Sequence, residues 1–196
     1  MNNMFVCPKI KIDNTPIEQV RKIKFLGVII NQFVDWKDHI YVIKQKVSKS
    51  LGIILRVRKS MPLTVLRSLY HTLMHPYFEY CNIIWAIDRN TVFDDLFVYQ
   101  KKALRIITNS SWRSHTAPLF KNLNILPLCN INDLQVASFI YCCIHRLLPA
   151  RFCAIFRTNA SLHSHDTRQK EHLHIFSHRL NIRKKHCLHF WPCSLE

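Results

Sequence analysis

The stretch KFLGVIINQFVDWKDHI, residues 24–40, contains the change of pattern that decides the fold class. Its first half is a dense run of apolar, largely β-branched residues, which predicts that residues 20–30 form a strand. We expect this strand to pair with residues 9–13 across the NTPI turn. In the second half, Asp35 is a candidate helix N-cap, with Asp38 three residues on. The sequence therefore predicts a small β element that leads directly into a helix.

A long amphipathic helix is expected after Asp35. Its apolar residues recur at spacings of three and four, as one buried face of a helix requires. They are Trp36, Ile40, Ile43, Val47, Leu51 and Ile54. The opposite face carries Lys46, Lys49 and Arg56. From residue 36 to residue 73 the only acid is Asp38, which favours an anion-binding face, and an ordinary solvated face is the alternative.

Prolines mark the limits of a second helix. Pro62 suits its first turn, and Pro76 kinks or ends it. Its buried face is expected to hold Leu63, Leu66, Tyr70 and Leu73. A third helix is expected from Thr91 as N-cap, with Asp94 and Asp95 in the first turn, where the helix dipole favours acids.

The third helix places Lys101 and Arg105, four residues apart, on one face. A last strong helix is expected over residues 131–145, opened by Asn130. Glycine occurs only at positions 27 and 52, which disfavours an all-β fold with many tight turns. After residue 161 no period is sustained, which predicts a loose tail.

Composition indicates an anionic partner. The chain has 196 residues with 28 Lys and Arg against 12 Asp and Glu, a net charge of +16. Nucleic acid is the leading candidate partner, an anionic membrane is the second, and a merely basic protein is the third. No apolar run approaches the ~18 residues of a membrane span, and the N-terminus lacks the pattern of a secretory signal. We therefore expect an intracellular protein, in the nucleus or cytoplasm, without membrane association.

Cysteine and histidine patterns do not predict a metal site. Eight cysteines include no C-x-x-C pair, so buried free thiols are expected. Seven histidines lie in the tail with Cys187 and Cys193, at positions 163, 165, 172, 174, 178, 186 and 189. Their spacing matches no established zinc template, and a basic, pH-sensitive tail is the preferred interpretation.

The segment VFDDLF, with Asp94 and Asp95, is the tempting catalytic candidate. Polymerase carboxylates hold two Mg²⁺ ions from a tight β-turn and need another Asp on a neighbouring strand. These two acids instead open an amphipathic helix, so helix-start charge explains them better. No Walker, G-x-S-x-G or H-E-x-x-H motif is present either. No catalytic residue is therefore predicted on this chain.

Four successive segments resemble the C-terminal part of jockey-like non-LTR retrotransposon reverse transcriptases over residues 20–149. They are VRKIKFLGVIINQFVDWKDHI, KVSKSLGIILRVRKSMPLTVLRSLYHTLMHPYFEYCNIIWA, VYQKKALRIIT and HTAPLFKNLNILPLCNINDLQVASFIY. In that family the segment matching KFLGVII is the primer grip, and the following helices form the thumb that clasps the template and primer. The resemblance implies that the catalytic palm precedes residue 20 and is missing here. It also implies that the aromatic-x-Asp-Asp turn is not VFDDLF.

The resemblance and the composition together give the expected organisation. We expect a mainly α fold with a small N-terminal β-hairpin, a helical thumb-like bundle and a loose basic tail. The expected domains are a palm-edge β element over residues 1–34, a thumb-like domain over 35–158 and a His/Arg-rich tail over 159–196. Mg²⁺ is expected only with the missing palm, and no cofactor is expected on this chain.

The expected function is sequence-tolerant binding of RNA or an RNA–DNA hybrid through backbone phosphates. The predicted nucleic-acid-binding residues are Lys22, Lys24, Phe25, Leu26, Gly27, Lys46, Lys49, Arg56, Lys59, Lys101, Lys102 and Arg105. A palm-bearing polymerase chain is the expected protein partner, and without it the chain is expected to be inactive. The alternative is a non-catalytic, domesticated or degenerate fragment that acts as a protein-interaction module through apolar surface around Phe25, Val28 and Ile30.

Overall fold

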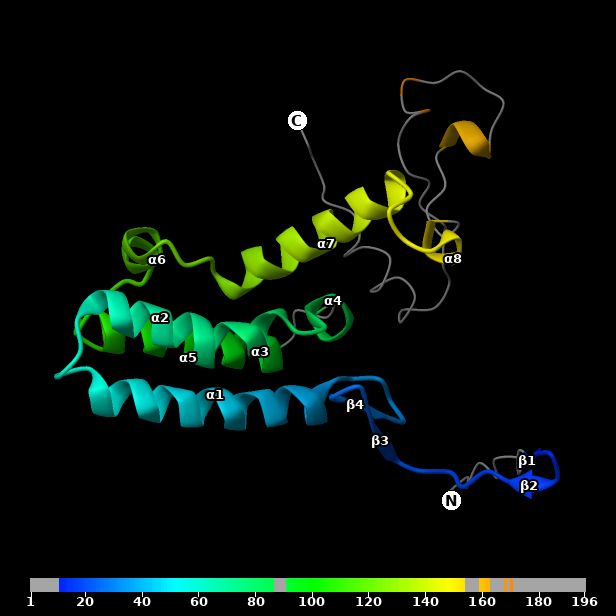
Figure 1. The fold of residues 1–196 in the computed structure, drawn as a ribbon, viewed down its shortest axis with the longest axis horizontal. Helices are drawn as coiled ribbons and strands as arrows, with labels where there is room; N and C mark the ends of the chain where they lie inside the picture. The colour runs from blue at the N-terminus through cyan, green and yellow to red at the C-terminus, as the bar shows by residue number, and fades with distance from the viewer. Residues whose placement is uncertain (1–10, 87–90, 154–158, 163–167, 169, 171–196) are drawn as a thin grey trace. The chain divides into compact units, whose positions relative to one another are not determined.

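The computed structural model describes residues 11–86, 91–153, 159–162, 168 and 170 (Figure 1). The expected mainly α fold with β-hairpin structure near the N-terminus is confirmed. The elements are β1 (Lys11–Ile12), β2 (Thr15–Pro16), β3 (Lys22–Phe25), β4 (Val28–Asn31), α1 (Lys37–Val57), α2 (Leu63–Leu73), α3 (His75–Glu79), α4 (Asn82–Trp85), α5 (Thr91–Ile107), α6 (Ala117–Leu123), α7 (Leu128–Ile144), α8 (Ala150–Cys153) and the 3₁₀ turn η1 (Asn159–Ser161). The chain divides into two compact units, one ending at His39 and the other beginning at Ile40.

The first unit contains two antiparallel hairpins. β1 pairs with β2, and β3 pairs with β4 in a register that places Phe25 opposite Val28. The predicted single strand over residues 20–30 is therefore wrong. The two residues between β3 and β4, Leu26 and Gly27, both have positive φ, at 45° and 83°. A two-residue loop with this geometry matches the right-handed twist of the flanking strands, so the apolar run folds back on itself.

A network of polar side chains joins the second hairpin to the start of α1. The Asn31 side-chain amide donates to Asp35 Oδ1 at 2.7 Å and to Asp38 Oδ2 at 3.1 Å. Asp35 Oδ1 also accepts the backbone N–H of Lys37 at 3.2 Å, which caps the helix close to the predicted position. The Asn31 hydrogen bond lowers the pKa of Asp35 below its ordinary value. These bonds fix where the extended chain becomes helical.

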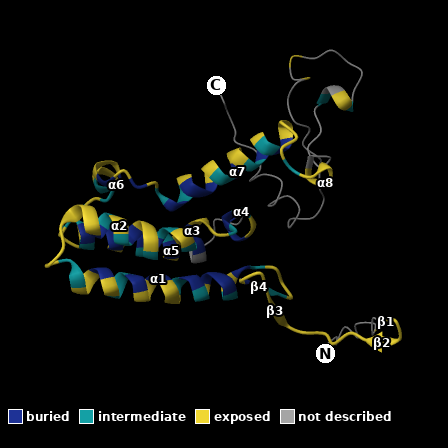
Figure 2. Ribbon diagram, in the orientation of Figure 1, coloured by how far each residue is buried: buried dark blue, intermediate teal, exposed yellow. Residues whose placement is uncertain are grey.

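The second unit is a bundle in which the helices pack through their apolar faces (Figure 2). α2 contacts α3 and α5, and α7 contacts α3 and α4. On α1, the predicted apolar residues Ile40, Ile43, Val47 and Ile54 are all buried, which confirms that face. Ser50 connects α1 to α2, because its hydroxyl donates to the Leu73 carbonyl at 2.8 Å. The 3.6-residue period of the sequence is therefore expressed as one buried stripe on a long helix.

A buried amide, Gln100 of α5, ties three parts of the bundle together. Its Nε2 donates to the Tyr70 hydroxyl at 2.8 Å and to the Leu126 carbonyl at 2.9 Å. Its Oε1 accepts the backbone N–H of Leu128, the first residue of α7, at 2.8 Å. Gln100 is fully buried, so each of these bonds replaces water that the group has lost.

A second buried polar contact joins α4 to α7. The Asn132 amide donates to Asn82 Oδ1, and Asn82 Nδ2 donates to the Phe78 carbonyl at 2.6 Å. Both asparagines are buried. Since each amide bonds a partner on a different helix, the pair fixes how these helices meet.

Several predicted boundaries and burials are wrong in detail. α7 begins at Leu128 rather than at residue 131, because Pro127 has an extended conformation and occupies the N-cap position. Leu63 was expected to be buried, but it is 52% exposed, since it lies in the first turn of α2 beyond the packed face. Pro76 lies in the first turn of α3, and α2 ends at Leu73, as expected. The predicted tail lies mostly outside the described residues, and so do its histidines and cysteines.

Candidate nucleic-acid interface

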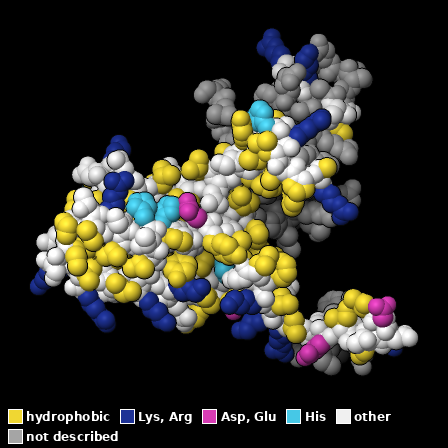
Figure 3. Space-filling model, viewed as in Figure 1, with side chains coloured by type: hydrophobic (Ala, Val, Ile, Leu, Met, Phe, Trp, Pro, Cys, Tyr) yellow, Lys and Arg dark blue, Asp and Glu magenta, His cyan; other side chains and the backbone are white. Residues whose placement is uncertain are grey.

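The outward face of α1 carries the basic stripe. Lys46, Lys49 and Arg56 are exposed on this helix, and Lys59 is exposed in the turn that follows it. Figure 3 shows Lys and Arg side chains along the edge that α1 forms. Within the described part of the chain, the ion pairs join Lys37 to Asp35, Lys44 to Asp95 and His75 to Glu79. None of the predicted binding residues takes part in these pairs, so their charge is not neutralised by a described carboxylate.

Aromatic rings hold some of these ammonium groups in place. Lys46 Nζ lies 5.2 Å from the centroid of the Tyr77 ring on α3. On the other side of α1, Lys44 Nζ lies 5.9 Å from the Tyr99 centroid, and Lys102 Nζ lies 5.1 Å from the same centroid. A ring face attracts a cation without cancelling its charge, so Lys46 and Lys102, which make no described ion pair, are ordered yet still available to a phosphate.

Tyr99 therefore brings α1 and α5 together in a basic cluster that the sequence alone did not reveal. Lys44 was not predicted, and neither was the supporting role of Tyr77 or Tyr99. Lys44 also pairs with Asp95 at 2.8 Å, which spans 51 positions in the sequence. The sequence could have indicated the contact between Tyr99 and Lys102, because Tyr99 lies three positions before Lys102 on the same helix. The long-range partner has no local signature.

The other two basic residues of α5 are placed differently. Lys101 Nζ lies 4.0 Å from the centroid of the Phe97 ring, one helical turn away. Arg105 donates from Nε to the Ser114 carbonyl at 3.1 Å, which leaves its two terminal nitrogens to other partners. Lys101 and Arg105 are therefore each anchored on the α5 surface by a contact that is not an ion pair.

The predicted hairpin residues all lie in the first unit. Lys22 and Lys24 are exposed on β3, while Leu26 and Gly27 form the turn. The side chains of Phe25 and Leu26 are 60% and 73% exposed. The hairpin thus presents two lysines and an apolar tip to solvent.

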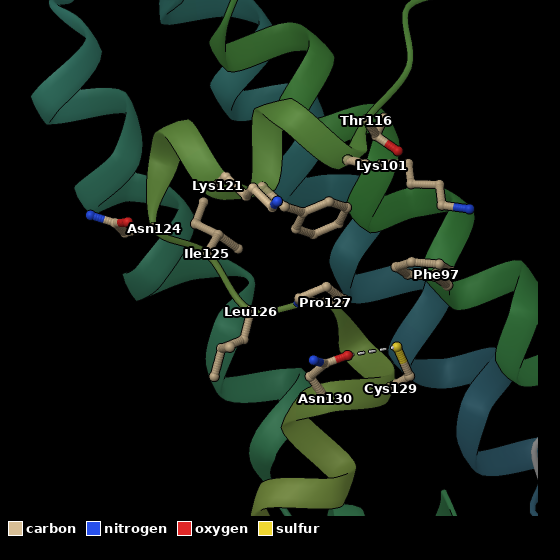
Figure 4. Close-up of a pocket in the computed structure, with 12 residues that line it drawn as sticks. Phe97, Lys101, Thr116, Lys121, Asn124, Ile125, Leu126, Pro127, Cys129 and Asn130 are labelled. Atoms are coloured by element: carbon tan, nitrogen blue, oxygen red, sulfur yellow. Dashed lines mark hydrogen bonds between the residues drawn. The ribbon is translucent and has the colours of Figure 1, made fainter.

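A cavity of about 750 Å³ lies among α5, α6 and the beginning of α7. Figure 4 shows Lys121 at its upper left and Lys101 at its right edge, with the Lys101 amine directed outward past Phe97, and Ile125, Leu126 and Pro127 along another side. Phe97 and Phe120 stack with their centroids 6.0 Å apart. This cavity was not predicted, because its walls come from three separate segments.

Asp94 lies in the first turn of α5 and is exposed, in agreement with the expected helix-start role, whereas Asp95 is exposed just after that turn and pairs with Lys44. In the described ranges, no group of three or more His, Cys, Asp or Glu side chains could hold a metal ion. Among the helices described, none is long and apolar enough to cross a membrane. The cysteines at positions 81, 129, 142 and 143 are free thiols, as expected, but among these four Cys143 alone is buried.

Two histidines, one near the end of α2 and one at the start of α3, form a small cluster. The rings of His71 and His75 lie 5.2 Å apart between centroids, and His75 Nδ1 lies 3.3 Å from Glu79 Oε2. Burial lowers the pKa of His71, and the neighbouring His75 and Arg67 lower it further. His71 therefore contributes little positive charge at neutral pH.

Comparison with known proteins gives one weak similarity. No protein-family model matches the chain, and no solved structure matches it significantly. Over 122 residues the chain is 24% identical to a curated protein of Drosophila melanogaster described as a probable RNA-directed DNA polymerase from transposon X-element. The match covers 60% of this chain and 13% of that protein's length. This similarity supports a segment related to reverse transcriptases.

Proposed function

We propose that this chain is the primer-grip and thumb part of a jockey-like non-LTR retrotransposon RNA-directed DNA polymerase. In this role it binds RNA or an RNA–DNA hybrid through backbone phosphates, without reading the base sequence. The similarity to a transposon polymerase and the helical bundle after a hairpin both support the proposal. The matched segment covers only 13% of that relative's length. We therefore propose polymerisation as an activity of a complete polymerase, to which this chain contributes the strand-binding part.

The observation that carries the proposal is the state of the basic residues on α1 and α5. Lys46, Lys49, Arg56 and Lys102 have no described carboxylate within ion-pair distance. Two of these lysines lie over tyrosine rings. Ammonium groups that are ordered but not neutralised are suited to a polyphosphate strand, because its phosphates supply the missing negative charge.

Catalysis requires groups that the described residues do not bring together. A polymerase active site holds two Mg²⁺ ions between carboxylates, whereas Asp95 here pairs with Lys44 and Asp94 lies on the exposed side of α5. We therefore assign Mg²⁺ binding to the palm of the polymerase. The bundle contributes strand binding, which positions the primer end for that palm.

Salt titration of binding to a labelled RNA–DNA hybrid tests this function. If the chain neutralises about five phosphates, the plot of log K against log salt has a slope of about −4 to −5. Two hybrids of unrelated sequence should bind equally well. A flat salt response, or binding to one sequence alone, contradicts the proposal.

The exposed hairpin tip supports a second candidate, a protein-interaction module. Phe25 and Leu26 are exposed, as a contact surface requires, but Val28 is 5% exposed and cannot serve, contrary to expectation. Size-exclusion chromatography separates the two candidates, because the interaction module forms complexes without nucleic acid and Phe25→Ser abolishes them.

A further inference from the structure

The cavity among α5, α6 and the start of α7 combines apolar walls with a positively charged rim. Phe97 and Pro127 are half-buried, and Leu126 is 45% exposed, so apolar atoms face the open space. Lys101 and Lys121 both line it, at different edges (Figure 4). None of its described lining residues is acidic. An occupant that complements this surface has a flat apolar part and negative charge beside it.

We propose that this cavity receives an unpaired base of a nucleic-acid strand, with the flanking phosphates on Lys101 and Lys121. A nucleotide has a heteroaromatic ring for the apolar walls and a phosphate on each side for the two ammonium groups. The volume of about 750 Å³ exceeds what one base fills, so the site admits a base with its sugar.

Continuity with the basic surface of α5 supports this occupant. Lys101 lies one helical turn before Arg105, so the two share a face of α5, and phosphates bound along that face pass the cavity mouth. The 4.0 Å contact of Lys101 with the Phe97 ring orders the ammonium at the rim before a strand binds. Thr116 and Asn130 add polar groups that can bond the edge of a base. This inference rests on the proposed function, and it locates at this cavity the part of the bound nucleic acid that is single-stranded.

Three probes test the inference with the full chain. The first is a blunt RNA–DNA hybrid, the second has a single-stranded extension of about six nucleotides, and the third has an abasic extension of equal length. We expect the normal extension to tighten binding about tenfold over the blunt hybrid. The abasic extension should recover only a small part of this gain, since it keeps the phosphates and lacks the bases.

Leu126→Gln is the main variant, with Leu134→Gln as its matched control. Both leucines are about half exposed, so neither substitution should unfold the chain. Leu126 also borders the groove between α3 and α7, and Leu134 borders that groove but does not line the cavity. We expect Leu126→Gln to remove most of the gain from the extension and to leave binding of the blunt hybrid unchanged. Leu134→Gln should change neither.

The outcomes separate this inference from the function on which it rests. Equal gains from normal and abasic extensions, or an unchanged gain in Leu126→Gln, overturn the base site while hybrid binding stands. Salt-insensitive binding of all three probes overturns the proposed function, and the base site with it. Displacement of the extension by an acidic peptide that itself binds through Leu126 shows a peptide site instead, which also overturns the inference.

Discussion

At the scale of single residues, Gln100 is a buried polar position whose loss should strongly affect stability. Its side chain bonds the Tyr70 hydroxyl, the Leu126 carbonyl and the Leu128 N–H inside the core. Gln100→Leu leaves these buried groups without partners, and we expect the free energy of unfolding to fall by about 2–4 kcal/mol. Urea denaturation of the wild type and of Gln100→Leu measures this difference in the free energy of unfolding. Gln45→Leu, at an exposed position of α1, should change stability by less than about 0.5 kcal/mol.

Tyr70 makes stability depend on alkaline pH. Burial raises the pKa of its phenol well above the ordinary value of 10, because the charged form loses water, although the Gln100 bond acts in the opposite direction. The unfolded chain therefore releases this proton at a lower pH than the folded chain does. The stabilisation is complete below pH about 10 and declines as pH rises further.

Tyr70→Phe should therefore flatten the decline of the unfolding free energy between pH about 10 and 11. It should also lower stability at neutral pH by about 1 kcal/mol, since the bond from Gln100 is lost. Tyr41→Phe is the control, because Tyr41 is exposed. An equal alkaline slope in wild type and Tyr70→Phe contradicts the assignment.

At the scale of elements, α1 is expected to bind phosphates through its outward face. Replacing Lys46, Lys49 and Arg56 together by Gln should reduce the steepness of the log K against log salt plot by about 2–3. Because these side chains are exposed and make no described ion pair, thermal stability should hardly change. A matched variant replaces Arg113, Arg146 and Arg151, exposed elsewhere, and should retain most of the wild-type slope.

The β3–β4 hairpin depends on its two-residue turn. Gly27 has φ of 83°, which a β-branched residue adopts only with strain, so Gly27→Val should destabilise the hairpin by about 1–2 kcal/mol. Leu26→Asn should act in the opposite direction, because Asn tolerates positive φ. The readout is amide exchange of Gln32, whose N–H donates to the Arg21 carbonyl at 3.0 Å. Equal exchange rates in both variants contradict the role of the turn.

The same elements show how far the sequence could be interpreted. The spacing of Ile40, Ile43, Val47 and Ile54 was sufficient to predict the buried face of α1, since a helix with that period has one apolar side. The turn at Leu26 and Gly27, which divides the expected strand into β3 and β4, was missed because an apolar run with one glycine is compatible with a straight strand or with a turn. The start of α7 was missed because apolar residues such as Leu134 and Ile144 lie on its exposed side too, which obscures the period.

The candidate interface was predictable only in part, for a similar reason. Charge and helical spacing located the stripe on α1. The Tyr99 contact of Lys44 and Lys102, and the cavity beside Lys101, depend on residues brought together from distant segments. The pattern of residues within one segment does not indicate which residues of a distant segment will contact it.

At the scale of the whole molecule, the net charge of +16 governs behaviour in solution. Repulsion among uncompensated cations weakens the compact state at low ionic strength. We expect the thermal midpoint to rise between about 10 and 150 mM NaCl, as the Debye length shortens to about 8 Å. Differential scanning fluorimetry at constant pH measures this. A midpoint that falls over that range contradicts the electrostatic explanation.

The three hydrogen bonds of the Gln100 side chain also limit how the helices of the bundle can move relative to one another. α5 cannot slide along α2 or α7 by even half a turn without breaking the buried bonds of Gln100 to the Tyr70 hydroxyl and the Leu128 N–H. These helices should therefore keep their register when a nucleic-acid strand binds or dissociates, and move together as one rigid body. Any bending during binding and release is therefore expected in the segments outside the Gln100 hydrogen bonds, and not as sliding between α2, α5 and α7.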